Sequence, residues 1–219
     1  MIIAIDGTSA AGKGTLAKRL QQFFKYAYLD TGALYRAVGK KVLDIGQDPT
    51  NAEIAVKVAK ELSPEVMLSL QNDSSIRTEE CGTAASKVSA IPEVRKALFD
   101  FQRNFALYPV FEDGTPANGA ILDGRDIGTV VCPEAQIKLF LIASPEIRAK
   151  RRLKELQDKG IYAIYEDVLA DVKKRDERDS NRAVAPLKPA DDAFILDTSD
   201  LTIDSVFTHV IDFINSKVK

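Results

Sequence analysis

The sequence has 219 residues, of which 45% are hydrophobic and 28% are charged, and its formal net charge is −2. This length is enough for one domain with a substantial core and inserted subdomains. The slight acidic excess argues against nucleic-acid binding as the main function, because phosphate backbones require a basic surface. No apolar run approaches the roughly 18 residues that cross a bilayer, and the apolar stretch 2–5 is too short for a secretory signal. We therefore expect a cytoplasmic protein that binds neither a membrane nor nucleic acid.

The cysteines and the single histidine do not form a recognisable reactive pattern. Cys81 and Cys132 lie far apart and in no metal-ligand spacing, which indicates two reduced thiols. His209 is the only histidine, and it lies among apolar residues of a predicted helix. These features argue against a histidine-based catalytic triad and against a histidine-rich metal site.

Short apolar runs that are typical of buried parallel strands recur along the chain. They span residues 2–5, 26–29, 120–124, 137–143 and 194–197. Apolar residues at helical spacing follow the first run, over 15–24, and the last run, over 203–214. Short strands that alternate with helices predict an α/β fold with a five-stranded parallel sheet and helices on both faces.

Two regions interrupt this alternation. Residues 40–107 hold mainly helical patterns, and residues 145–185 are highly charged and helical. We interpret both as insertions into the sheet protein. The stretch 108–119, "YPVFEDGTPANG", is rich in Gly, Pro, Asn and Asp, and this composition predicts a surface loop.

The stretch 7–15, "GTSAAGKGT", matches the P-loop pattern G-x-x-x-x-G-K-[ST], except that Gly14 separates Lys13 from Thr15. A predicted buried strand precedes it and an amphipathic helix follows it. Such a loop binds phosphates, because its backbone N–H groups converge on an anion and the helix N-terminus adds its dipole. Lys13 supplies a charge for the β- and γ-phosphates, and Thr15 a hydroxyl for Mg²⁺. The sequence therefore predicts a nucleoside-triphosphate site at Gly7, Thr8, Ser9, Ala10, Ala11, Gly12, Lys13, Gly14 and Thr15.

A triphosphate site leaves three classes of protein open, namely a small-molecule kinase, a GTPase or ATPase switch, and a motor. The guanine-reading pattern NKxD, which many switches carry, is absent from the sequence. Asp123 follows the third predicted strand, where its carboxylate is placed to help hold Mg²⁺ through water.

A small-molecule kinase must hold a second anion that faces the first, and arginine suits this because its fork grips phosphate bidentately. Arg36 follows the second predicted strand and Arg125 the third. Ligands bind at the carboxyl ends of the strands in an open parallel sheet, so both arginines are expected near the P-loop. The alternatives are that Arg36 is a solvated helix residue and that Arg125 forms an ion pair with Asp123 or Asp126.

The run 174–182, "KRDERDSNR", carries a formal charge on seven of its nine residues. If the run is helical, four of its side chains fall on one face, which would be suited to close over anions. These four are Arg175, Arg178, Asp179 and Arg182. The alternative is a solvated helix that the i,i+4 pairs Asp171–Arg175 and Arg175–Asp179 support. In either case we expect the remaining members Lys174, Asp176 and Glu177 on the solvated surface.

Several motifs occur together in this chain, in the order "GTSAAGKGT", "LDTGALYR", "AASKVSAIPEVRKAL", "LDGRDIGTVV" and "RDERDSNRAVAPL". Together they resemble the bacterial cytidylate kinase family, P-loop enzymes that phosphorylate CMP and dCMP with ATP. The resemblance spans nearly the whole chain, and the last two motifs are its most specific parts. It implies one P-loop kinase unit with a core (1–38, 108–148 and 186–219), an NMP-binding region (39–107) and a lid (149–185). The alternatives are another nucleoside monophosphate or small-metabolite kinase on the same fold, or a P-loop ATPase without an acceptor.

The resemblance also implies roles for individual side chains. The catalytic group is Lys13, Arg125, Arg175 and Arg182. ATP, accompanied by Mg²⁺, is held by the P-loop with the lid arginines Arg151 and Arg152, and Thr15 and Asp123 are the expected metal ligands. CMP contacts are expected from Thr31, Tyr35, Arg36, Ser86, Arg95, Arg125, Asp126, Arg175, Asp179 and Arg182.

Within the CMP set, Arg36, Arg125 and Arg182 would hold the phosphate, and Arg175 and Asp179 would contact the sugar. Ser86, Arg95 and Asp126 would read the cytosine, because a carboxylate accepts from its N4 amino group and arginine donates to its acceptors. Both substrates are small molecules, and we expect a monomer.

The sequence departs from the family pattern in the P-loop and in the CMP pocket. Thr8 and Ala10 stand where many members have proline and glycine, and Thr31 replaces a serine. Ala10 is expected to restrict the backbone of the P-loop, since alanine has a Cβ that glycine lacks.

Overall fold

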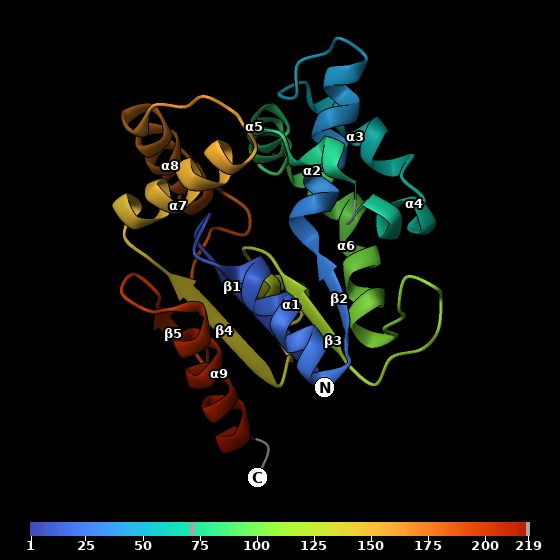
Figure 1. Ribbon diagram of the computed structural model, residues 1–219. Helices are drawn as coiled ribbons and strands as arrows, with labels where there is room; N and C mark the ends of the chain where they lie inside the picture. Colours follow the sequence, from blue (N-terminus) through green and yellow to red (C-terminus); the bar gives the residue numbers. More distant parts are fainter. Residues whose placement is uncertain (71–72, 218–219) are drawn as a thin grey trace.

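The computed structural model describes residues 1–70 and 73–217, and its centre is a sheet of parallel strands in the order β2-β3-β1-β4-β5 (Figure 1). The strands are β1 Ile2–Gly7, β2 Ala27–Asp30, β3 Ala120–Asp123, β4 Ile137–Ile142 and β5 Phe194–Asp197. All five predicted strands are confirmed. β2 begins one residue later than expected and extends to Asp30, whose carboxylate caps the helix that follows.

Helices account for most of the remaining described chain. They are α1 Lys13–Phe24, α2 Thr31–Asp44, α3 Ala52–Lys60, α4 Pro64–Ser69, α5 Glu79–Val88, α6 Pro92–Leu107, α7 Pro145–Asp158, α8 Tyr165–Ser180 and α9 Ile203–Lys217, with a 3-10 turn η2 Ser74–Arg77 and a π-helical turn η3 Ile127–Val131. No helix of the described part of the chain is both long and apolar enough to span a membrane.

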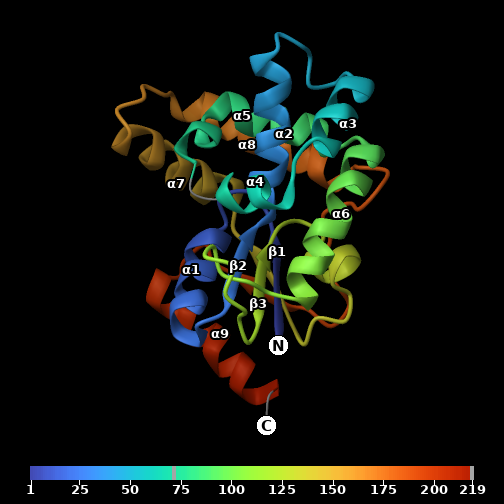
Figure 2. The same ribbon diagram turned by 90° about the vertical axis from the view of Figure 1, so that its right-hand side faces the viewer.

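Alternating side chains of the strands pack against helices on the two faces of the sheet. In β1, Ile3 and Ile5 belong to the core beneath α1 and α9, whereas Ile2 and Ala4 belong to the core that α6 and η3 cover. Figure 2 shows α1 and α9 on one side of the strands and α6 on the other. The predicted fold, a parallel sheet with helices on both faces, is confirmed.

Both predicted insertions are helical, and most of their helices lie beyond the carboxyl ends of the strands, whereas α6 runs back along one face of the sheet (Figure 1). α2 to α6 share a core of their own around Val38, Val58 and Leu98. α7 and α8 form a pair packed through Leu156 and Val172. Because α2 runs unbroken through residue 39 and α7 begins at Pro145, the boundaries 39–107 and 149–185 stay a prediction.

The predicted surface loop 108–119 is mostly exposed, as expected. It folds back on itself through an isolated bridge between Val110 and Pro116, and the carboxylate of Asp113 accepts hydrogen bonds from the N–H and hydroxyl of Thr115. The two cysteines, Cys81 and Cys132, are buried free thiols, as the sequence predicts.

Candidate active site

The P-loop occupies the turn between β1 and α1, at the centre of the carboxyl edge of the sheet. Gly7 has a φ of 141°, and a Cβ there would lie 2.0 Å from the carbonyl oxygen of Leu141, so only glycine fits. Ala10 adopts a left-handed φ of 59°, a conformation that L-residues with a Cβ rarely take. The P-loop therefore holds alanine in a backbone conformation that glycine would adopt at a lower free-energy cost.

Lys13 folds back over the P-loop. Its ammonium group donates to the carbonyl oxygens of Gly7 at 3.0 Å and Thr8 at 2.7 Å. Burial, together with the positive charge of Arg125, lowers the pKa of Lys13 well below the usual range of lysine. A bound polyphosphate would supply the negative charge that this buried ammonium lacks.

Two further carbonyl oxygens of the P-loop are held from outside it. Arg148 donates to Ser9 at 3.3 Å, and the hydroxyl of Thr198 donates to Ala11 at 3.1 Å. By contrast, no oxygen within residues 1–70 and 73–217 accepts from the backbone N–H of Ser9, Ala10 or Gly12. Because these carbonyl oxygens already accept hydrogen bonds while the N–H groups have no acceptor, the turn is suited to bind an anion.

Asp123 ends β3 beneath the start of α1. Its Oδ2 lies 3.7 Å from where a Cβ on Gly14 would be and accepts a hydrogen bond of 2.8 Å from the hydroxyl of Tyr28. Burial, with the nearby charge of Asp30, raises the pKa of Asp123 above the usual range of aspartate. Within the described residues no three His, Cys, Asp or Glu side chains form a metal cluster. One carboxylate and the exposed hydroxyl of Thr15 suit Mg²⁺ that arrives with phosphates and keeps several waters.

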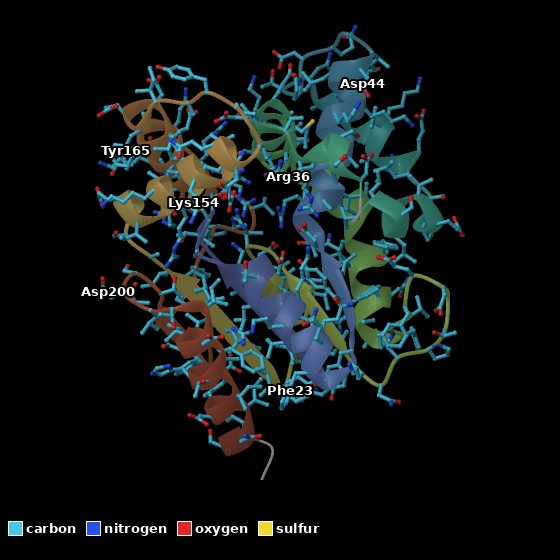
Figure 3. All side chains as sticks on the ribbon, in the orientation of Figure 1. Phe23, Arg36, Asp44, Lys154, Tyr165 and Asp200 are labelled. Atoms are coloured by element: carbon cyan, nitrogen blue, oxygen red, sulfur yellow. The ribbon has the colours of Figure 1, made fainter. Side chains whose placement is uncertain are left out.

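A cavity of about 220 Å³ opens from Ser9 and Ala10 of the P-loop to the helices around it. Its basic lining comes from α2 and from the α7–α8 pair, namely Arg36, Arg152, Arg175 and Arg178. Figure 3 shows Arg36 in the middle of the molecule, where α2 faces that pair. The guanidinium of Arg36 donates to the carbonyl oxygens of Ile76 at 3.2 Å and Thr78 at 3.1 Å.

Three arginines of the "KRDERDSNR" run are only partly exposed, and each of them buries one unsatisfied donor. The Nε atoms of Arg175, Arg178 and Arg182 are buried and have no hydrogen-bond partner among the described residues. Burial, with the positive charge of Arg125, lowers the pKa of Arg175 to about 9. Native proteins satisfy nearly all buried polar groups, so unsatisfied guanidinium donors beside the P-loop indicate an anion site.

A second, smaller cavity of about 50 Å³ adjoins the first and shares Arg175 with it. Its lining includes Thr31, Tyr35, Ser86, Arg95, Arg125, Asp126, Asp179 and Arg182. With Arg175, and with Arg36 in the larger cavity, these are all ten residues that the sequence predicts for CMP. A nucleotide needs a pocket of several hundred Å³, so the base can enter only if these walls move apart.

Two of the side chains that we expect to recognise the cytosine base contact each other in this cavity. Arg95 and Asp126 form a short, buried ion pair, and the guanidinium of Arg95 lies 5.5 Å from the centre of the Tyr35 ring. The hydroxyl of Ser86 is buried without a hydrogen-bond partner among the described residues. The pocket therefore presents a carboxylate, a guanidinium and a free hydroxyl within one cavity.

Arg151 lines a third cavity, of about 360 Å³, on the other side of the P-loop. It is bound to Thr198, with Nη2 2.5 Å from the carbonyl oxygen and Nη1 3.0 Å from the hydroxyl. The cavity runs from Gly12 and Thr15 to the apolar side chains of Leu201 and Ile203. Arg152, in contrast, pairs with Glu155 at 3.1 Å and lines the basic cavity.

Comparison with known proteins decides the family, because the family model described as cytidylate kinase matches residues 3–216. The chain belongs to the cytidylate kinase family. It is 57% identical over 216 residues to a cytidylate kinase of Paramagnetospirillum magneticum, with 99% of this chain and 98% of the relative covered. It is 52% identical over 217 residues to that of Rhodospirillum rubrum, with the same coverage. An uncharacterized protein from Eubacterium ventriosum, of known crystal structure, shares the fold with a TM-score of 0.53 at 17% identity, over 99% of this chain and 98% of the other.

Some expectations for the charged run are wrong. Asp176 is not a solvated residue, because it forms a bidentate ion pair with the buried Arg148. Lys174 and Glu177 are exposed, as expected. α8 ends at Ser180, so Arg182 follows the helix instead of continuing its face, and its Nη2 donates to the carbonyl of Ala185 at 2.8 Å.

The partner of Arg125 also differs from the alternatives that the sequence suggests. Arg125 pairs neither with Asp123 nor with Asp126; its Nε donates to Asp179 at 2.9 Å. Asp179 is thereby engaged across the site and not in the expected i,i+4 pair with Arg175. An aspartate from α8 and an arginine from the loop after β3 thus meet between the two insertions.

Three residues of the site were not expected from the sequence. Asp6, buried at the end of β1, accepts from the N–H groups of Ile127 at 2.8 Å and Gly128 at 2.7 Å, and so holds the segment after Asp126. Arg148 and Thr198 hold the P-loop carbonyls described above. The signal for Asp6 was its place at a strand end next to Gly7; the contacts of Arg148 and Thr198 join segments far apart in the sequence.

Proposed function

We propose that the chain phosphorylates CMP and dCMP with Mg·ATP by in-line transfer, with ATP on the P-loop and the acceptor among the arginines of the two basic cavities. The observation that carries this proposal is the group of buried, unsatisfied guanidinium donors on Arg175, Arg178 and Arg182 beside the P-loop. A nucleotide-binding protein without an acceptor would have no use for such donors, which cost free energy when no anion satisfies them.

On the ATP side, the open N–H groups of the P-loop and Lys13 bind the β- and γ-phosphates. The cavity between Arg151, Thr198 and Leu201 takes the adenosine, because it adjoins Gly12 and has an apolar wall for a base. Mg²⁺ enters with ATP, and the hydroxyl of Thr15 and, through water, the carboxylate of Asp123 are the ligands we assign to it.

On the acceptor side, Arg36, Arg125 and Arg182 bind the phosphate of CMP, and Asp179 orients the sugar. The base replaces the direct contact between Arg95 and Asp126. Asp126 then accepts from the N4 amino group of cytosine, and Arg95 and the free hydroxyl of Ser86 donate to its acceptor atoms. Uracil exchanges the amino donor for a carbonyl acceptor, so it leaves Asp126 without a donor and faces repulsion.

The transfer itself needs no strong general base, because the attacking oxygen belongs to a phosphate that is already anionic. Lys13, Arg125, Arg175 and Arg182 stabilise the charge on the transferring group and align the two phosphates. Closure of the α7–α8 pair over both cavities excludes water and limits hydrolysis of ATP. We propose the monomer as the active form.

A coupled assay of ADP release tests the proposal. The enzyme is supplied with Mg·ATP and, in separate reactions, with CMP, dCMP, UMP, AMP, shikimate or water alone. Rapid turnover with CMP and dCMP is expected. A preference for AMP, UMP or shikimate would overturn the cytosine assignment, and equal ADP release without an acceptor would show an ATPase.

A further inference from the structure

Arg148, in the first turns of α7, is among the largest side chains that are fully buried, with 2% of its surface exposed. Its Nε donates to the carbonyl of Ala143 at 2.8 Å, which anchors it to the end of β4. Its two terminal nitrogens bind Asp176 of α8, at 2.9 and 2.5 Å, and Nη1 also donates to Ser9 at 3.3 Å. One guanidinium therefore joins the P-loop, the sheet and the lid helix α8.

The bond to Ser9 acts on the peptide that precedes Ala10 in the P-loop. In a trans peptide the C=O and the next N–H point in opposite directions, so holding the oxygen of Ser9 turns the N–H of Ala10 away from Arg148. Ala10 has a left-handed φ of 59°, which is unfavourable for a residue with a Cβ. The chain thus holds an intrinsically disfavoured backbone conformation in place with a buried charged donor.

The bond to Asp176 acts on the acceptor side. Asp176 lies between Arg175, which lines both basic cavities, and Asp179, which binds Arg125. A bidentate, mostly buried arginine–carboxylate pair fixes both the position and the rotation of the helix that carries these side chains.

We propose that Arg148 is a positioning residue of the phosphoryl transfer: it holds the Ser9–Ala10 peptide in the phosphate-binding conformation and couples it to the lid helix through Asp176. The proposal rests on the proposed function in taking the P-loop as the ATP site. Arg148 thus has two separate effects. Its bond to Ser9 affects nucleotide binding, and its bond to Asp176 affects turnover with CMP.

A double-mutant cycle between Arg148→Met and Ala10→Gly tests the first effect. The probe is a non-hydrolysable ATP analogue with Mg²⁺, titrated calorimetrically without an acceptor. Loss of Arg148 should weaken binding about tenfold when Ala10 is present but only about twofold when glycine, which adopts the left-handed conformation freely, replaces it. Equal losses in both backgrounds would overturn the proposal, since a purely structural arginine has no reason to be coupled to position 10.

Arg148→Lys is the second variant, because it keeps a charge beside Asp176 but lacks the fork that reaches Ser9. Even if the methionine variant fails to fold, the lysine variant should show the same coupling to Ala10→Gly. Asp176→Asn tests the other effect: kcat with CMP should fall about tenfold while binding of the ATP analogue changes less than about twofold. A weaker analogue affinity with unchanged kcat would contradict the assigned division of roles.

Arg103→Met is the matched control. Arg103 also joins a carboxylate, Glu134, at 2.5 Å and a carbonyl, that of Val131, at 2.9 Å, but it lines none of the three cavities. It should alter neither analogue binding nor kcat. The proposed function is tested separately by CMP phosphorylation of the wild-type preparation, so inactivity there rejects the function, whereas missing coupling rejects only the role of Arg148.

Discussion

Asp179 of α8 and Arg125 of the loop after β3 form an ion pair, Oδ2 to Nε 2.9 Å, with 6% and 17% of their side-chain surfaces exposed. Although burial opposes ionisation, Arg125, Arg175 and Arg182 hold the pKa of Asp179 below its ordinary value of 3.8. The pair joins α8 to the loop that follows β3, on the side of the P-loop where we propose that CMP binds. It also gives the arginine cluster a negative charge before any substrate arrives.

Asp179→Asn should therefore impair acceptor binding selectively. The variant loses the charge-assisted bond that orients Arg125 and the carboxylate that we assign to the sugar of CMP. We expect the KM for CMP to rise about 30-fold, since truncating one partner of a buried pair typically costs a few kcal/mol. Steady-state kinetics with varied CMP at saturating ATP measure the effect; an equal rise in the KM for ATP would contradict the assignment.

Arg182→Ala should lower kcat/KM for CMP by a factor of about a hundred or more, because the variant loses a phosphate ligand that aligns the acceptor. The affinity for an ATP analogue should remain close to that of the wild type, since Arg182 lines only the smaller cavity. Calorimetric titration and steady-state assays of the same preparation separate the two effects. Undiminished activity with CMP would refute the phosphate-binding role of Arg182.

Gly82→Ala should perturb Arg36 without disturbing the fold. A Cβ on Gly82 would lie 3.2 and 3.3 Å from the two terminal nitrogens of Arg36, which are the flexible end of that side chain. We expect the KM for CMP to rise about fivefold, with a change in the free energy of unfolding below about 1 kcal/mol.

Gly39→Ala is the matched comparison for that variant. Its Cβ would lie 2.8 Å from the Cβ of Ala84 and 2.9 Å from the Ala84 backbone. Neither of these atoms can move away by a change of side-chain rotamer. It should destabilise the protein by about 2 kcal/mol, measured by urea unfolding, because α2 and α5 must separate. If Gly82→Ala lowers the free energy of unfolding more than Gly39→Ala does, the side chain of Arg36 cannot move away from the new Cβ as we assume.

Asp6→Asn should remove part of the pH dependence of stability. Burial raises the pKa of Asp6 from 3.8 to about 6, against the opposing hydrogen bonds from Gly128 and Ile127. The folded state therefore binds the proton more tightly than the unfolded chain. The contribution of Asp6 to stability is complete below pH 3.8 and is lost as the pH rises through about 6.

The free energy of unfolding of the wild type, relative to Asp6→Asn, should thus fall across this interval by up to about 3 kcal/mol. Urea unfolding at several pH values measures it, with Asp204→Asn at an exposed carboxylate as the control. A difference that stays constant with pH would show that Asp6 is ionised equally in both states.

Much of this architecture was predictable because it depends on local patterns. Apolar runs and a P-loop reveal β1 and α1 directly, and the position of Arg36 and Arg125 after strands places them at the carboxyl edge. The motif resemblance assigned the ten CMP residues, and the structure gathers them around two adjoining cavities. Their individual roles stay predictions.

The missed contacts are those between segments that only the tertiary fold brings together. Helical spacing cannot tell whether Asp176 faces water or a buried arginine on another helix, so the charged run was divided wrongly at that residue. The end of α8 at Ser180 depends in the same way on the chain that follows, because the N–H of Leu187 donates to the carbonyl of Asp179 at 2.8 Å. The periodicity of residues within the run cannot predict that bond.

The unsatisfied arginines have a consequence for the protein outside catalysis. A fold that buries guanidinium Nε donors without partners leaves them unsatisfied until an anion binds, so bound nucleotides should stabilise the folded state. Its resistance to heat and to proteases should therefore rise and fall with the supply of the metabolites it consumes. A cell short of nucleotides would hold this enzyme in its least durable form.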